Sequence, residues 1–181
     1  MTGKSHLAVM LFLGCIPAAM AQNSAPAADD GHLSTTTSFV VKAPIQRAAP
    51  LFGPAGMQCW LGGHMQAEFI HSQSPQNVAG AVFTMQQGPQ KSTWVNTMLN
   101  VKAGKMQYAS FTPGSMVLVV DVRMTAAGKD STRVELTHTV TPLSAEAREA
   151  MKSMGAHSQE HIAAAEKAIE GCLATGGGMR Q

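Results

Sequence analysis

Apolar and polar residues alternate through the second half of the chain, from residue 78 to residue 142. A period of two over such runs predicts β-strands, and short turns rich in Gly, Pro and Lys separate five of them. Connections this short join antiparallel neighbours, because a parallel crossover needs about a dozen residues or more. The pattern predicts a meandering antiparallel sheet, joined by a strand at 38–42 and by a further one around 66–71.

The last two predicted strands indicate which face of the sheet is buried. One face carries the residues Met116, Leu118, Val120, Val122, Met124, Val134, Leu136, His138 and Val140. The opposite face carries the charged residues Asp121, Arg123, Arg133 and Glu135, which can pair across the strands in water. The sheet is therefore expected to have one apolar and one solvated face.

A long amphipathic helix is predicted over 143–173. Ser144 caps its start and the glycines at 176–178 end it. A stripe at 3.6-residue spacing consists of Met151, Met154, Ser158, His161, Ile162, Ala165, Ile169 and Cys172. This helix is expected to cover the apolar face of the sheet.

The segment 52–64, FGPAGMQCWLGGH, separates the first strand and a short helix starting at Pro44 from the main sheet. Its four glycines and its proline make it a poor helix and a poor strand, so it is predicted to be a glycine-rich loop. It nevertheless carries Met57, Cys59 and Trp60, which are residue types that are usually buried. The loop is therefore expected to support other parts of the core, with Trp60 at its edge or at the mouth of a pocket.

The first residues are typical of a secretory signal. Residues 1–21 combine Lys4, an apolar run and the small-x-small site at 19–21, and the apolar run is too short for an ordinary transmembrane helix. A lipoprotein signal ending before Cys15 is the alternative. Residues 22–37 are rich in Ala, Ser, Thr and Asp and are predicted to be a flexible tether. The folded domain is then expected at 38–174, followed by a disordered tail at 175–181.

Charge and cysteine content limit the possible binding partners of the protein and the compartment in which it folds. Removal of residues 1–21 leaves 12 Lys and Arg against 11 Asp and Glu, which gives no electrostatic footprint for nucleic acid or an anionic membrane. It also leaves two cysteines, Cys59 and Cys172. An even pair in an oxidising compartment favours a disulfide, and two buried free thiols are the alternative.

The order of elements, together with APIQRAAPLFGPAGMQCW, GAVFTM, TWVNTMLN, YASFTPG and TRVELTHTVTPLS, resembles the SRPBCC superfamily of START-type, Bet v 1-like and polyketide cyclase-like proteins. The resemblance implies an α+β helix-grip fold. Its curved antiparallel sheet of about six to seven strands wraps around a long C-terminal helix, with one or two short helices after the first strand. It also implies an internal cavity for an apolar ligand, and it places Cys59 opposite Cys172.

Residues of the apolar sheet face and of the helix stripe are the candidates for the cavity wall: Trp94, Tyr108, Met116, Leu118, Val120, Leu136, His138, Met154, Ser158, His161 and Ile162. His138 is the one polar residue on an otherwise apolar strand face, so a cavity would give its imidazole a ligand or water as partner. A satisfied core histidine is the structural alternative.

Other chemistry has weaker support. The segment 157–161, HSQEH, matches the inverted zinc-protease spacing. A zinc peptidase also needs a third ligand and a substrate cleft, and Glu160 is expected to point away from the buried stripe that carries His161. Met151, Met154, His157 and His161 could hold copper, although methionine commonly fills core gaps. No nucleophile elbow and no phosphate-binding glycine loop occur, so no cofactor and no catalytic residue is predicted.

Three functions follow from these observations. The first is an exported protein that binds a small hydrophobic or lipid-like molecule between sheet and helix. The second is a cyclase- or hydrolase-like enzyme in which His138 or Tyr108 acts as general acid or base. The third is an accessory protein with a filled core and no ligand.

Overall fold

The computed structural model describes residues 27–29, 31–62, 65–71, 78–87, 89–156 and 158–176. Its elements are β1 (Ala27–Asp29), β2 (His32–Val41), α1 (Ile45–Ala48), the 3-10 helix η1 (Ala49–Phe52), α2 (Pro54–Trp60), β3 (Met65–His71), β4 (Val82–Gln87), β5 (Gln90–Asn100), β6 (Lys105–Thr112), β7 (Met116–Gly128), β8 (Ser131–Pro142), α3 (Ala145–Ala156) and α4 (Ser158–Ala174). The predicted signal at 1–21 lies outside the described residues, as do residues 177–181 of the tail.

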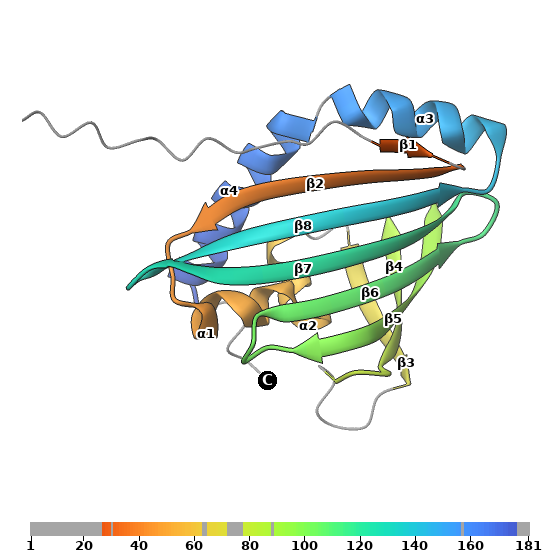
Figure 1. The fold of residues 1–181 in the computed structure, drawn as a ribbon. Coiled ribbons are helices and arrows are strands. Elements are labelled where there is room, and N and C mark those ends of the chain that lie inside the picture. The colour runs from red at the N-terminus through yellow and green to blue at the C-terminus, as the bar shows by residue number, and fades with distance from the viewer. Residues whose placement is uncertain are drawn as a thin grey trace, which may run out of the picture.

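All described strands belong to one antiparallel sheet of eight, in the order β1-β2-β8-β7-β6-β5-β4-β3. Figure 1 shows the sheet curving, with α1, α2 and α4 gathered at one end of it and α3 at the other. The predicted meander over β4–β8 is confirmed, and the short turns between its strands are the physical reason for the antiparallel pairing. The sheet has one strand more than the six to seven predicted.

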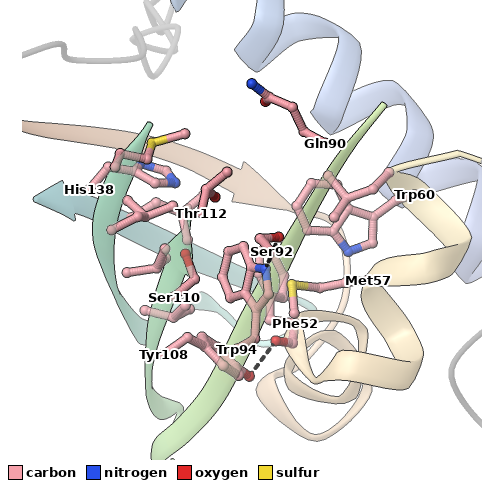
Figure 2. A pocket seen from close by; sticks show the side chains of 16 residues that line it. Phe52, Met57, Trp60, Gln90, Ser92, Trp94, Tyr108, Ser110, Thr112 and His138 are labelled. Atoms are coloured by element: carbon pink, nitrogen blue, oxygen red, sulfur yellow. Dashed lines mark hydrogen bonds between the residues drawn. The ribbon is translucent and has the colours of Figure 1, made fainter. Parts of the chain in front are cut away.

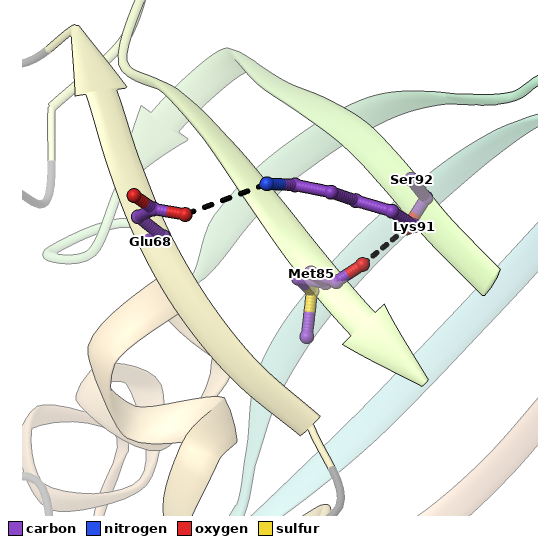
Figure 3. A network of polar contacts seen from close by, with 4 residues as sticks. All are labelled: Glu68, Met85, Lys91 and Ser92. Carbon is purple, nitrogen blue, oxygen red and sulfur yellow. Dashed lines mark hydrogen bonds and ion pairs between the residues drawn. The ribbon is translucent and has the colours of Figure 1, made fainter. Parts of the chain in front are cut away.

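Side chains alternate between the two faces of the sheet as predicted. On the outer face, Arg123 lies directly opposite Glu135. On β5, Lys91 points outward and its Nζ lies 3.5 Å from the carboxylate of Glu68, across β4. The next residue, Ser92, donates from its hydroxyl to the carbonyl of Met85 (Figure 3).

The flexible tether predicted for 22–37 is wrong for β1 and for residues 32–37, which form the first half of β2. β1 pairs with β2, residues 33–37 pair with β8, and the Thr36 and Thr137 hydroxyls lie 2.9 Å apart. A run of threonines is poor in large apolar side chains, yet β-branched residues favour strands, and cross-strand Thr pairs stabilise them. The domain therefore extends on its N-terminal side at least to Ala27.

The loop predicted for 52–64 is also partly wrong, because Pro54–Trp60 forms the helix α2. Pro54 occupies the first turn, where its missing N–H costs nothing. Gly56 is buried against η1, and a Cβ there would overlap the Pro50 carbonyl and the Leu51 backbone. The glycine that weakens the helix in isolation is thus what lets two helical segments pack closely.

The C-terminal region forms two helices, α3 and α4, in place of the single long helix predicted. His157 between them lies outside the described residues. Gly155 falls in the last turn of α3, and a glycine inside a helix costs about 1 kcal/mol relative to alanine. α4 packs on β2 and α2 through Ile162, Ile169 and Cys172, which belong to the main core.

The Cys59–Cys172 disulfide joins α2 to α4 across 113 residues of sequence. Lys42 pairs with Glu170 at 3.1 Å, and Arg47 donates to the carbonyl of Leu173 at 3.3 Å. The second contact adds a side-chain donor to a carbonyl in the last turn of α4, which also accepts from the backbone N–H of Gly176. Covalent and polar contacts therefore fix α4 at the end of the sheet where α1 and α2 lie.

Candidate functional site

A partly open cavity of about 310 Å³ lies on the inner face of the curved sheet. Its wall consists of Phe52, Met57, Trp60, Leu61, Gln90, Ser92, Trp94, Tyr108, Ser110, Thr112, Met116, Leu118, Val120, Val122, Leu136 and His138. These residues come from η1, from α2 and the residue after it, and from the inner faces of β5–β8. The wall is mainly apolar, as is usual for sites that bind small molecules.

Aromatic rings dominate one side of the cavity. Phe52 and Trp60 contact each other with ring centroids 5.6 Å apart, and Trp94 stacks on Phe83 at 6.1 Å. Both tryptophans and the one tyrosine of the chain line this cavity. Figure 2 shows Trp60 and Met57 of α2 on the opposite side of the cavity from His138.

Hydrogen bonds to neighbouring residues fix the polar ends of these rings. The Trp60 indole donates to the carbonyl of Leu51 at 2.6 Å, and the Trp94 indole donates to the hydroxyl of Ser92 at 2.7 Å. The Tyr108 hydroxyl donates to the carbonyl of Phe52 at 2.6 Å (Figure 2). The rings are therefore held in one orientation, and their N–H and O–H groups are already used.

Tyr108 is poorly suited to acid–base chemistry. Its side chain is fully buried, and burial raises the pKa of its phenol well above the ordinary value. Its proton is held by the Phe52 carbonyl. Tyr108 therefore holds η1 in place beside the cavity through this hydrogen bond.

His138 lies on the inner face of β8, opposite Val120 of β7. Protein atoms surround the ring, while part of its surface stays accessible because that part faces the cavity. Burial lowers the pKa of the imidazole from its ordinary value of 6.5, so the neutral ring predominates at neutral pH. Neither ring nitrogen has a hydrogen-bond partner in the described part of the chain.

The structure brings seven of the eleven predicted cavity residues together in one wall: Trp94, Tyr108, Met116, Leu118, Val120, Leu136 and His138. Ile162 instead belongs to the packed core, where 9% of its surface is exposed. Met154, Ser158 and His161 have side chains outside the described residues. That any of these residues contacts a ligand stays a prediction.

Sequence reasoning did not place Phe52, Met57, Ser92, Ser110 and Thr112 at the cavity. The last two share the inner face of β6 with Tyr108, so the period-two rule could have found them. Phe52 and Met57 could not be found in this way, because their segment carries no strand pattern.

Candidate metal ligands are not brought together among the described side chains, where no group of three His, Cys, Asp or Glu could hold an ion. The predicted copper and zinc candidates His157 and His161 lie outside that part. Within the described residues, no helix is long and apolar enough to cross a membrane.

No protein-family model and no curated protein sequence matches the chain. Solved structures are similar to it. Norcoclaurine synthase from Thalictrum flavum, in complex with dopamine and hydroxybenzaldehyde, superposes with a TM-score of 0.59 at 12% identity over 94% of this chain and 98% of its own. The crystal structure of Ara h 8.0201 gives a TM-score of 0.59 at 11% identity, covering 80% of this chain and 99% of its own. CalU16 from Micromonospora echinospora gives 0.57 at 12% identity, covering 87% and 93%.

These similarities define the fold as Bet v 1-like. The helix-grip fold that the sequence resemblance implies is thereby supported, and membership of the SRPBCC superfamily stays a prediction. Identities this low carry no statement about ligand or reaction.

Proposed function

We propose that the chain is an exported protein that binds a small hydrophobic molecule in the cavity between the sheet and the helices. One observation carries the proposal: the inner face of the sheet is hollow beside Leu118 and His138, although the same face is filled around Val134. Protein cores are closely packed, so a filled core would not contain an empty volume of about 310 Å³ beside two tryptophans.

The size of the cavity favours a compact ligand over a long lipid. Its volume lies at the low end of the roughly 300–1,000 Å³ that ligand sites occupy. At about 30 Å³ per water molecule, the space corresponds to about ten waters. A molecule of one or two rings fits this space, whereas an extended acyl chain would project out of it.

The helices supply the cover of the site. α2 contributes Met57 and Trp60 to the wall, and the disulfide ties it to α4. We infer that α3 and α4 together take the place of the single gripping helix of the helix-grip arrangement. The disulfide also supports export, because such bonds persist in oxidising compartments.

Filling the cavity tests this function. In the variant Leu118→Trp the indole enters the cavity, while Val119→Trp places the same side chain on the outer face of the same strand. Titration with naphthalene, followed by calorimetry, is expected to give saturable binding to the natural chain and to Val119→Trp. Leu118→Trp is expected to lose it. No binding by the natural chain, or equal binding by all three, contradicts the proposal.

An enzyme remains the second candidate, and His138 is the observation that favours it. Its neutral imidazole faces the cavity without a partner, which is the state a general base requires. The sequence predicts that His138 or Tyr108 would act as general acid or base. Because the Tyr108 hydroxyl donates to the Phe52 carbonyl, His138 is the candidate of the two for this role. Once a bound molecule is identified, loss of its turnover in His138→Gln with binding retained would support this function.

A further inference from the structure

The polar side chains in the cavity wall fall into three groups. Trp60, Ser92, Trp94 and Tyr108 form hydrogen bonds within the protein. Gln90, the first residue of β5, is exposed to solvent. The side chains of Ser110, Thr112 and His138 form no hydrogen bond with the described residues. We call these three residues the polar wall, because they carry the free hydrogen-bonding capacity inside the cavity.

The polar wall spans three neighbouring strands. Ser110 and Thr112 lie on the inner face of β6, and His138 lies on the inner face of β8, with β7 between them. At about 4.8 Å per strand, the backbones of β6 and β8 are about 10 Å apart, and the inner face of the curved sheet directs all three side chains into one cavity. Figure 2 shows all three on the side of the cavity away from Trp60.

The polar atoms of this wall face the cavity. Ser110 is 5% exposed and Thr112 is 7% exposed, so water reaches their hydroxyls only from the cavity. Among the described residues, the one buried side-chain polar atom without a partner is Oδ1 of Asn96, so the hydroxyls of Ser110 and Thr112 keep accessible surface. Neither hydroxyl supports another part of the fold by a hydrogen bond. The polar wall is therefore a feature that the packing of the sheet does not require.

Fixed charge is missing from the described wall. None of its 16 residues is Lys, Arg, Asp or Glu. The charged residues of β7 and β8, among them Asp121, Arg123, Arg133 and Glu135, lie on the outer face. Burial favours the neutral form of His138 as well. A carboxylate or ammonium group would lose its hydration in this cavity and find no counter-charge.

We propose that the polar wall recognises an uncharged hydroxyl or carbonyl group on a compact, ring-containing ligand whose apolar body lies against Trp60 and Trp94. This inference rests on the proposed function. Neutral imidazole can accept a hydrogen bond from a ligand hydroxyl at one ring nitrogen and donate from the other. The Ser110 and Thr112 hydroxyls can donate to a ligand oxygen. His138 is thus the residue that determines specificity, and it acts by hydrogen bonding.

Three probes of one shape test this inference on the full-length exported chain at neutral pH: naphthalene, 2-naphthol and 2-naphthoate. The first has no polar group, the second is uncharged and the third is an anion. Calorimetric titration is expected to give 2-naphthol an affinity about three to ten times that of naphthalene, as one net hydrogen bond provides. The anion is expected to bind at least about tenfold more weakly than 2-naphthol.

Variants assign the preference to the polar wall. His138→Leu is expected to bring the 2-naphthol to naphthalene ratio close to one, and Thr112→Val to lower it by a smaller factor. Thr137→Val removes a hydroxyl on the outer face of β8, beside His138 in sequence, and is expected to leave the ratio unchanged. If His138→Leu does not fold, as thermal melting would reveal, Ser110→Ala and Thr112→Val still report on the same wall.

The outcomes separate the two proposals. Absence of naphthalene binding overturns the proposed function. Binding of naphthalene with no preference for 2-naphthol, or with tightest binding of 2-naphthoate, overturns the inference and leaves the proposed function standing. A preference that survives in His138→Leu and Thr112→Val also overturns it.

Discussion

The inner-face side chains at the two ends of the β7–β8 hairpin have different surroundings. Near the hairpin turn, Met124 is 5% exposed and Val134 is fully buried in the core. Towards the other end, Leu118 and His138 keep accessible surface because they line the cavity. Both ends have the same alternation of residues, so the strands themselves do not determine which end is hollow.

The difference comes from what covers each end. α1, η1 and α4 place Ala48, Leu51 and Ile169 against the filled end, and all three are inaccessible to solvent. Across the hollow part of the same face, α2 supplies the opposite wall, and its Met57 and Trp60 face the cavity. Stability and binding are therefore divided along one pair of strands, and four predictions test that division.

The largest expected effect is the loss of the Cys59–Cys172 disulfide. A bridge that closes a loop of this length stabilises by about 4–5 kcal/mol in the chain-entropy model, so reduction should lower the free energy of unfolding by about that amount. Urea denaturation with and without a dithiol measures it. The dithiol should not change the unfolding midpoint of the double variant Cys59→Ser, Cys172→Ser. Equal midpoints for the oxidised and reduced natural chain would contradict stabilisation by the disulfide.

Two methionines of the inner face compare the ends directly. Met106 is 2% exposed in the filled core, and Met116 lines the cavity. Met106→Ala should cost about 2–5 kcal/mol because it leaves a cavity that the core cannot fill. Met116→Ala should cost about 1 kcal/mol or less, because its side chain already borders open space. Equal losses in chemical denaturation would mean that the two ends do not differ.

Tyr108 lies at the boundary between the ends, and its hydroxyl bonds the Phe52 carbonyl. Tyr108→Phe should cost about 1–3 kcal/mol, because the carbonyl loses its buried partner. The raised pKa of the phenol adds a second test. The folded state keeps the proton better than the unfolded state, so stability should fall as pH rises above about 10. Ultraviolet titration should detect no tyrosinate at that pH until the chain unfolds.

The smallest effect is expected from His138. Its pKa is lower in the folded than in the unfolded chain, so the unfolded state binds more protons and stability should decrease as pH falls through about 6.5. Denaturation curves across that range should show the decrease in the natural chain. The free energy of unfolding should depend less on pH in His138→Leu. An identical pH dependence in both chains would mean that another residue takes up the proton.

Much of the sheet could be predicted from the sequence, because turn residues and a period of two are local signals. A threonine-rich segment such as that around Thr36 lacks large apolar residues and predicts a tether, and only its pairing with Thr137 of β8 makes it a strand. Gly56 argues against a helix, and only the close approach of η1 explains it. In both cases the deciding contact is tertiary packing, which a local sequence pattern does not show.

The candidate site could be predicted only in part, for the same reason. The inner-face residues of β7 and β8 follow from alternation, and so does His138. Leu118 and Met124 are equivalent in the sequence pattern, yet one borders the cavity and the other is packed. Only the placement of η1 and α2 distinguishes them.

The most direct test of the hollow end uses its two tryptophans as probes. Trp60 and Trp94 are the only tryptophans in the chain, and both line the cavity. Nuclear magnetic resonance of the chain labelled with nitrogen-15 resolves their indole N–H signals during a titration with naphthalene. Both indole signals are expected to shift together and saturate, while the backbone amide signal of Glu135 on the outer face stays in place. Indole signals that remain unchanged at saturating naphthalene would contradict binding at the hollow end.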